Sequence, residues 1–331
     1  MAHYVSSVPH IVTFVLAGLA LAGGAWIVSF ATEQVGQRFG AAGTGLLQAT
    51  LGNLPEFFVV IFALNAGQRI VAQTAILGSI LVNALVVLGL VFVVGASREP
   101  DKTMRFSPRL PNDTATLLLV TSFIIVLVGL ADSAHDPASH HVKTISIISA
   151  VAILAVYSFW VRQYLSGEKS GPVAGGTPRL ATAASLWLLV VSGAAAAFAS
   201  DWFVNALEPT IHSLGISQGF AGLVIVATAG NAVEHAVGVV LAAKGQAELA
   251  ISVVKNSVAQ VAAFLFPVLV LASLLTTTTL TFALAPVYAG ALVGTAIIMW
   301  QITTDGEATP FEGMALIAVF VILATVAWFE P

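Results

Sequence analysis

Two glutamates, each preceded by an asparagine three residues earlier, are the residues of this chain best suited to bind a metal ion. They end two copies of the pattern A-T-x-G-N-x-x-E, at residues 49–56 and 227–234. Each residue of the second copy lies 178 positions after its counterpart, as Glu234 lies after Glu56. Carboxylate, amide and carbonyl oxygens are the hard ligands that Ca²⁺ takes in proteins. The repeated motif therefore predicts an oxygen-lined cation site, and its constant spacing indicates an internal duplication.

Both motifs weaken the helix that carries them. The asparagine and the glutamate of each copy are one turn apart and share a helix face. Gly52 and Gly230 are poor helix formers at the same level, and Pro55 lacks the N–H that a carbonyl one turn earlier would need. The second motif has Val233 in place of the proline, so its distortion must depend on Gly230 and Asn231. Carbonyls freed by such a break are further oxygen ligands for a cation.

Four polar residues of two other segments could also face this site: Ser79 and Asn83, one turn apart, and Ser257 and Gln260. Ser257 follows Ser79 by the same 178 positions that separate the glutamates, which favours a direct role as ligands. The alternative is ordinary hydrogen bonding between packed membrane helices.

His235 directly follows the second glutamate and is the histidine that falls in the centre of a predicted helix. Two interpretations remain open. Either its ring hydrogen bonds to a backbone carbonyl in the core, or it relays protons to and from Glu234.

The sequence offers the two glutamates no basic partner. Both fall near the centres of long apolar segments, where an ionised carboxylate costs at least a few kcal/mol unless it is paired or ligated. Lys255 lies about two turns from the end of its segment, and we expect its long side chain to reach the membrane surface. Glu56 and Glu234 must therefore be protonated or bind an added cation. A group that alternates between these states is a proton–cation exchange site.

The segments that position these residues define an all-α membrane protein. Of the 331 residues, 58% are hydrophobic and only 8% are charged, whereas soluble domains have about 25% charged residues. The absence of cysteine excludes disulfides and thiol chemistry, and no basic stripe supports nucleic-acid binding. The first apolar run, 11–32, has no Lys or Arg before it, and we expect it to be retained as a helix.

Ten segments are long enough to cross a bilayer, which takes about 20 apolar residues. They are residues 9–32, 43–66, 70–95, 114–132, 144–164, 180–205, 217–243, 249–273, 282–303 and 312–330. Lys and Arg accumulate in cytoplasmic loops, and nine of them follow odd-numbered segments. Both termini are therefore expected to face outward.

The two motifs lie on the second and seventh segments, an offset of five. Because this offset is odd, the two halves must enter the membrane in opposite orientations. Inverted repeats of this kind are typical of secondary transporters. The predicted units are a first five-helix repeat at 1–164, a cytoplasmic linker at 165–179 and a second, inverted repeat at 180–331.

The segments G-N-L-P-E and G-N-A-V-E-H-A-V-G resemble the paired motifs of the Ca²⁺/H⁺ exchanger (CAX) family of the Ca²⁺/cation antiporter superfamily. Residues 300–313, W-Q-I-T-T-D-G-E-A-T-P-F-E-G, resemble the final loop of that family, D-G-E-x-x-W-x-E-G. The sequence departs from the family at 256–260, N-S-V-A-Q in place of G-S-A-T-Q, and in the final loop, where Pro310 and Phe311 stand in the place in which tryptophan is common. The acidic cytoplasmic stretch that many members have between the halves is missing.

The resemblance implies a Na⁺/Ca²⁺ exchanger-like fold of ten helices, in which the first and sixth helices move. It implies that Glu56 and Glu234 share a Ca²⁺ ion and carry protons, with His235 as the family's motif histidine. Together with the motif backbone, the predicted cation ligands are Glu56, Glu234, Asn53, Asn231, Gly52, Gly230, Ala49, Ala227, Ser79, Ser257 and Gln260. Proton transfer is predicted for Glu56, Glu234 and His235.

The sequence thus predicts a Ca²⁺/H⁺ antiporter of a prokaryotic inner membrane, not an enzyme, which exports Ca²⁺ by alternating access. Its expected partners are Ca²⁺, H⁺ and the lipid bilayer, with no resident cofactor and no nucleic acid; homo-oligomerisation is left open. A Na⁺/Ca²⁺ exchanger on the same scaffold is the alternative. A pore would need a continuous polar stripe, and a zinc hydrolase would need a second histidine four residues from the first.

Overall fold

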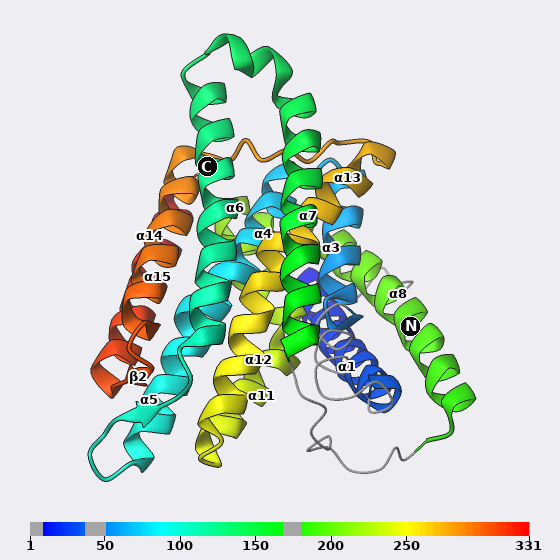
Figure 1. Cartoon of the computed structure of the whole chain (residues 1–331). Helices are drawn as coiled ribbons and strands as arrows, with labels where there is room; N and C mark the ends of the chain where they lie inside the picture. Colours follow the sequence, from blue (N-terminus) through cyan, green and yellow to red (C-terminus); the bar gives the residue numbers. More distant parts are fainter. Residues whose placement is uncertain (1–8, 37–50, 168–179, 331) are drawn as a thin grey trace.

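The computed structural model describes residues 9–36, 51–167 and 180–330, and these residues are almost entirely helical. Most helices run between the same two ends of the molecule, and a helical hairpin projects beyond the others at one end (Figure 1). The prediction of an all-α polytopic protein is therefore confirmed.

The described helices of the first half carry the first motif near the start of α3. They are α1 (His10–Gly36), α3 (Leu54–Asn65), α4 (Arg69–Leu81), the π-helix η2 (Val82–Val87), α5 (Leu88–Arg98), α6 (Arg109–Ser133), the 3₁₀ helix η3 (Pro137–His141) and α7 (Val142–Gly167).

The second half carries its motif across the junction of α10 and α11. Its helices are α8 (Thr182–Leu214), α9 (Gln218–Phe220), the π-helix η4 (Ala221–Val226), α10 (Ala227–Gly230), α11 (Ala232–Ala243), α12 (Ala247–Gln260), the π-helix η5 (Val261–Leu265), α13 (Phe266–Ala272), the 3₁₀ helix η6 (Ser273–Leu275), α14 (Pro286–Thr303) and α15 (Pro310–Phe329).

Eight helices within the described residues are long and apolar enough to cross a membrane. Counted as one span, the bent pair of Gln218–Gly230 and Glu234–Ala243, whose two parts meet at 64°, brings the number to nine. The remaining predicted segment, 43–66, corresponds to the short apolar helix α3, and residues 43–50 lie outside the described part of the chain. The predicted segments are thus recovered wherever the structure describes them.

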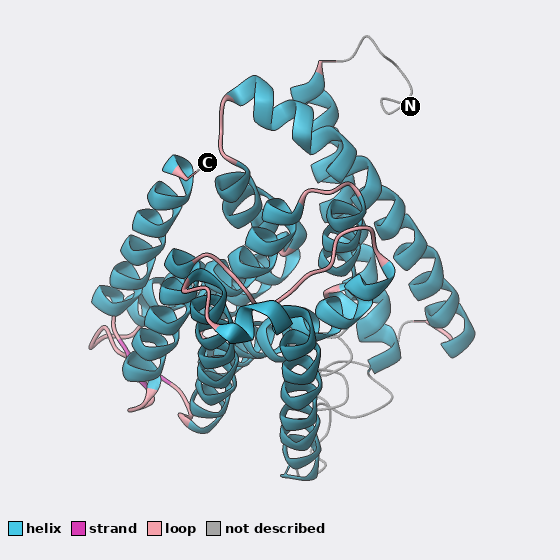
Figure 2. Cartoon of the chain, turned by 90° about the horizontal axis from the view of Figure 1, so that it is seen from above, coloured by secondary structure: helices cyan, strands magenta, loops and turns pink. Residues whose placement is uncertain are grey.

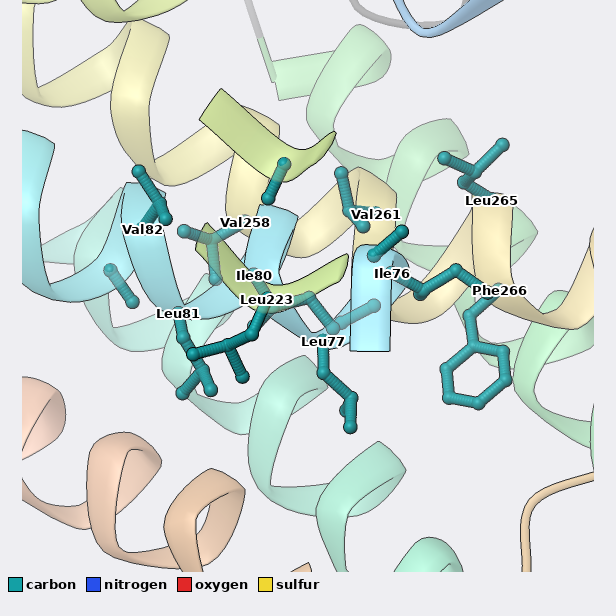
Figure 3. Close-up of a cluster of buried hydrophobic side chains, with 14 of the residues drawn as sticks. Ile76, Leu77, Ile80, Leu81, Val82, Leu223, Val258, Val261, Leu265 and Phe266 are labelled. Carbon is teal, nitrogen blue, oxygen red and sulfur yellow. The ribbon is translucent and has the colours of Figure 1, made fainter. Parts of the chain in front are cut away.

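Two continuous helical rods form the centre of the protein. One consists of α4, η2 and α5, and the other of α12, η5 and α13. Side chains from both rods and from η4 pack together with almost no exposed surface (Figure 3). The labelled residues of this core are Ile76, Leu77, Ile80, Leu81, Val82, Leu223, Val258, Val261, Leu265 and Phe266.

A π-helical segment interrupts both rods at the same place in the repeat. η2 begins at Val82, three residues after Ser79, and η5 begins at Val261, four residues after Ser257. Such π segments are rare and are found frequently at functional sites, because one extra residue per turn changes the direction in which the following side chains point. The matching interruptions support the predicted duplication.

Helices α1 and α8 pack against each other along one side of the molecule (Figures 1 and 2). A Cβ atom at Gly24 would lie 3.6 Å from Ala196 Cα, which is an ordinary van der Waals contact, so the two helices lie close together here without requiring a glycine. Helix α8 runs to Leu214, nine residues beyond the predicted end at 205. The prediction was wrong because the polar residues after 205 continue the helix, which ends only where Gly215 adopts a left-handed conformation (φ 64°).

The connecting loops separate into two groups at opposite ends. At one end, β1 (Met104–Arg105) pairs antiparallel with β2 (Glu307–Ala308), and the Ser107 N–H donates to Glu248 Oε1 at 2.6 Å. This end, which also carries Lys102 and Lys244, is called the basic end below. At the other end, the Thr277 hydroxyl donates to the Leu64 carbonyl at 3.0 Å. The loops after odd-numbered segments that the structure describes therefore lie together, as predicted.

Candidate cation site

Both motifs interrupt their helices at the asparagine. Asn53 precedes α3 with φ −82° and ψ 9°, and Asn231 separates α10 from α11 with φ −98° and ψ 9°. These angles lie in the sparsely populated bridge region, where many active-site residues are found. The second motif has no proline, so Pro55 is not required for the break, and the prediction that Gly230 and Asn231 distort the second copy is confirmed.

Each glutamate lies in the first turn of the helix that follows its break. Glu56 is in the first turn of α3, and Glu234 is in the first turn of α11. Unpaired N–H groups give a helix N-terminus a partial positive charge, which stabilises a nearby carboxylate by about 0.3–1 kcal/mol. This contribution is far smaller than the cost of an ionised carboxylate within a membrane, so the helix ends alone do not neutralise the pair.

The two motifs cross, because each glutamate lies against the glycine of the other copy. A Cβ atom added to Gly230 would lie 3.1 Å from Glu56 Oε1, and one added to Gly52 would lie 3.1 Å from Glu234 Oε1. The glycines therefore leave room for the opposite carboxylates. The reciprocal contacts bring both glutamates into one site across the repeat, where their charges repel each other when both are ionised.

Hydrogen bonds between the halves hold the polar side chains of the site. The Asn231 amide donates to Ser79 Oγ at 2.9 Å. The Asn83 amide donates to Ser257 Oγ at 3.2 Å, and the Ser257 hydroxyl donates to Glu234 Oε2 at 2.6 Å. The structure thus brings both predicted serines to the site, where they orient an asparagine and a glutamate.

Several buried oxygen atoms of the site accept no hydrogen bond. They include Glu56 Oε2, Asn231 Oδ1 and Gln260 Oε1. Buried polar atoms are normally satisfied, and an exception indicates an absent water molecule or ion. A cavity of about 10 Å³ lies among Glu56, Ser79 and Gly230, which is at the lower limit of the space for one water molecule. The site is therefore nearly closed around Glu56.

No basic side chain neutralises the glutamates in the part of the chain that the structure describes. Both ion pairs found there involve Arg105, with Asp101 and Glu307 at the basic end. Lys255 is fully buried, and its Nζ donates to Thr303 Oγ1 at 3.3 Å. The prediction that Lys255 reaches the surface was wrong, because α14 covers the side chain and supplies a hydroxyl partner.

The remaining predicted residues differ in how the structure places them. His235 Nε2 is buried without a hydrogen-bond partner, so this nitrogen makes no bond to a core carbonyl. The Ala227 carbonyl already accepts from the Asn231 backbone and side chain at 3.3 and 3.0 Å. Ala49 lies outside the described residues.

Sequence reasoning missed a contact between α8 and the first motif. Ser200, fully buried on α8, lies with its hydroxyl 3.3 Å from the Pro55 carbonyl and 2.8 Å from the Ala196 carbonyl. The sequence shows only a serine in an apolar helix, so no local signal could have identified this partner.

Carboxylates alone do not complete a metal site here. The described residues contain no group of three or more His, Cys, Asp or Glu side chains that could hold an ion. A bound cation would therefore depend on amide, hydroxyl and backbone oxygens as well, which is a donor set suited to Ca²⁺ rather than to a soft transition metal.

An all-helical membrane protein with two broken helices, whose breaks and carboxylates meet across an internal repeat, has the architecture of a membrane transporter. The chain belongs to the family described as sodium/calcium exchanger protein, whose profile matches residues 9–162 and 184–329. The matched ranges include both motifs and exclude the predicted linker.

Curated relatives span nearly the whole chain. The Ca²⁺/H⁺ antiporter of Synechocystis sp. is 29% identical over 342 residues, which cover 96% of this chain and 91% of the relative. The Ca²⁺/H⁺ antiporter ChaA of Bacillus subtilis is 28% identical over 299 residues, with 89% and 85% covered.

Solved structures share the fold. Native YfkE superposes with a TM-score of 0.82 at 26% identity, covering 97% of this chain and 93% of that one. The H⁺/Ca²⁺ exchanger CAX superposes with a TM-score of 0.76, 17% identity and coverage of 97% and 86%, which establishes similarity of fold alone.

Proposed function

We propose that this chain is a Ca²⁺/H⁺ antiporter, a secondary active transporter that exports Ca²⁺ in exchange for protons. The observation that carries the proposal is the crossed pair, in which Glu56 lies against Gly230 and Glu234 lies against Gly52. Two carboxylates share one buried site without a basic partner among the described residues. Ca²⁺ or protons can neutralise them, and the relatives of known name exchange these two ions.

The proposed cycle alternates between two forms of the pair. With Glu56 and Glu234 ionised, the site binds Ca²⁺ from one side of the membrane. Protonation from the other side removes the negative charge and releases the ion. Because each carboxylate can take one proton, the simplest stoichiometry is two protons for each Ca²⁺. The fully ionised, empty pair is disfavoured within the membrane, so the site crosses in the loaded or the protonated form.

The proposed cation ligands divide into those that neutralise the charge of the ion and those that complete its coordination shell. The glutamates supply the charge, and Asn53 and Asn231 supply amide oxygens from the breaks. Ser79, Ser257 and Gln260 complete the shell or hold the other ligands in place, with backbone oxygens of Ala49, Gly52, Ala227 and Gly230. The Asn231 Oδ1 and Gln260 Oε1 atoms are free to accept an ion. His235 remains a proposed proton carrier for Glu234.

The remaining parts of the proposal concern the setting of the protein. The inner membrane of a prokaryote, a cytoplasmic basic end and two outward termini follow from the distribution of Lys and Arg. The two inverted units at 1–164 and 180–331, and the linker at 165–179, follow from the position of the motifs. Because the chain has no cysteine, single cysteines introduced at Lys102 and Ser139 would report the orientation by labelling from one side.

Transport in everted membrane vesicles tests the exchange mechanism. We expect ΔpH to drive ⁴⁵Ca²⁺ uptake by the parent protein, and either Glu56→Gln or Glu234→Gln to abolish it. Glu99→Gln, which changes an exposed carboxylate at the basic end, is the matched control and should retain full uptake. Retention of exchange in either site variant would refute the mechanism.

Na⁺/Ca²⁺ exchange is the second candidate, because the family profile is described by that activity. A Na⁺ gradient in place of ΔpH distinguishes the two functions in the same vesicles. Uptake driven by Na⁺ and not by ΔpH would assign the chain to Na⁺/Ca²⁺ exchange. The proposed cation site would be unchanged by that result.

A further inference from the structure

A pocket at the basic end opens between α6, α7 and α12. Its volume is about 360 Å³, and its lining includes Arg109 and Asp113 of α6, Trp160 of α7, and Glu248 and Ser252 of α12. The lining therefore carries two carboxylates and one guanidinium. No residue of the cation site itself lines this pocket, so the pocket and the site are separate spaces.

Polar residues continue from this pocket along α12 toward the cation site. Glu248, Ser252, Asn256 and Gln260 follow one another at intervals of four residues, which places them along one side of the helix. The Asn256 amide donates to Ser252 Oγ at 3.3 Å. Burial increases along the series, from the exposed Glu248 through two half-buried residues to Gln260, which is 2% exposed. From first to last the series spans about 18 Å at 1.5 Å per residue.

Helix α7 supplies the facing side of this line. The ring of Trp160 lies at the pocket, and its centroid is 5.7 Å from that of the Tyr157 ring, which lies one turn further from the pocket along α7. The hydroxyl of Tyr157 lies next to the Gln260 side chain. Polar groups of two helices therefore converge on Gln260 from the pocket.

The polar atoms along this line are not satisfied by protein hydrogen bonds of normal geometry. Asn256 Oδ1, the Tyr157 hydroxyl and Gln260 Oε1 are all buried and form no hydrogen bond of normal geometry. Leaving a buried polar atom unsatisfied costs about 1–3 kcal/mol. Ordered water that hydrogen bonds to several such atoms is the common explanation. Three of these atoms lie along one line, and a chain of water molecules would satisfy them.

The series is specific to the second half of the repeat. The counterparts of Glu248, Ser252, Asn256 and Gln260 in the first half are Ile70, Thr74, Gly78 and Val82. A glycine and two aliphatic residues cannot continue a polar line. The feature is therefore not a requirement of the fold, because the duplicated rod packs without it.

We propose that a hydrated passage runs from the pocket at the basic end, between α7 and α12, to Gln260 and the cation site, and that it conducts protons. The proposal rests on the proposed Ca²⁺/H⁺ exchange and adds a separate route for one of the two ions. Water and neutral hydroxyl and amide groups can relay a proton without a large opening. Ca²⁺ needs six to eight oxygen ligands, and between Glu248 and the site this passage offers no carboxylate to it.

The test compares two transport modes in proteoliposomes that contain the full chain. ΔpH-driven ⁴⁵Ca²⁺ uptake requires proton movement, whereas exchange of ⁴⁵Ca²⁺ for unlabelled Ca²⁺ at equal pH does not. We expect Tyr157→Phe and Asn256→Leu to lower the initial rate of ΔpH-driven uptake at least fivefold and to leave Ca²⁺/Ca²⁺ exchange within twofold of the parent protein. Asn256→Ser, which keeps a hydroxyl in the passage, should restore most of the rate.

Tyr288→Phe is the matched control, because Tyr288 on α14 also has a buried hydroxyl without a hydrogen-bond partner but lies outside the passage. It should change neither mode. Equal loss of both modes in Tyr157→Phe, or no loss in either passage variant, would overturn the proposal. A parent protein that exchanges Ca²⁺ for Ca²⁺ but does not respond to ΔpH would instead refute the proposed function, and the passage with it.

Discussion

Alanine substitutions of the two motif glycines, Gly230 and Gly52, should affect the crossed site to different extents. A Cβ atom at position 230 would meet three atoms of the Glu56 side chain, Oε1 at 3.1 Å, Cγ at 3.2 Å and Cδ at 3.3 Å. At position 52 it would meet a single atom, Glu234 Oε1, at 3.1 Å. A rotation of the carboxylate relieves one contact but not three. Gly230→Ala must therefore displace the whole Glu56 carboxyl group, whereas Gly52→Ala need not displace Glu234.

The expected loss of transport rate follows from how far the Glu56 carboxyl group must move. Ordinary contact begins at 3.4 Å, so the Glu56 carboxyl must move by about 0.3 Å. A misplacement of about 1 Å in a preorganised site can cost about 100-fold in rate, which scales to about fourfold here. Gly52→Ala meets a single oxygen at the same 3.1 Å, which a rotation of the Glu234 carboxylate can move aside, so its effect should be smaller, within about twofold. Both glycines sit in helical segments, where alanine is favoured over glycine by up to about 1 kcal/mol, so stability should not fall.

The assay is the Ca²⁺ dependence of ΔpH-driven ⁴⁵Ca²⁺ uptake in proteoliposomes, with thermal unfolding measured on the same preparations. We expect Gly230→Ala to lower Vmax/KM about fourfold at unchanged or raised Tm, and Gly52→Ala to have the smaller effect. Equal effects of the two variants, or a larger effect of Gly52→Ala, would show that the glycines do not make room for the opposite glutamates as described.

Two further predictions concern residues outside the motifs. Replacing the buried amino group by an apolar side chain of similar length, Lys255→Met, should raise Tm or leave it unchanged, because it removes a polar group that costs free energy to bury. Thr303→Val removes the hydroxyl partner and keeps the amino group, so it should lower stability by about 1–3 kcal/mol. The opposite order in a thermal-shift assay would contradict this account. In the basic-end loop, the hydrogen bond from Arg105 holds the pKa of Asp101 below its usual value of 3.8, so its stabilising contribution is present above that value and is lost as pH falls through the lowered pKa. Asp101→Asn should therefore lower Tm slightly at pH 7 and not at pH 2; a difference that persists or grows at pH 2 would show that the ion pair is not its source.

Much of the fold could be predicted from the sequence because membrane spans and duplications leave strong patterns. Apolar segments identify the helices, and the constant offset of 178 residues relates Ser79 on one rod to Ser257 on the other. The end of α8 could not be predicted, because residues that leave the bilayer as a helix and those that leave it as a loop have the same polar composition.

The sequence was sufficient to predict the motifs of the site but not the contacts that their residues make with other helices. The spacing indicated that Asn231 and Glu234 share a helix face. The helix breaks lie at the glycine–asparagine pairs, where they were predicted. The sequence did not show that Gly52 lies against Glu234, that Asn83 holds Ser257, or that α14 buries Lys255. Each of these contacts joins residues distant in the chain, and periodicity within one helix carries no information on its partner.

The exchange of contacts between the two motifs has a consequence for the origin of the protein. Neither half contains a complete site, because every carboxylate needs the space that the other half provides. A single-motif precursor would therefore have needed a second copy of itself to build the site, and duplication within one gene would have made that pairing permanent.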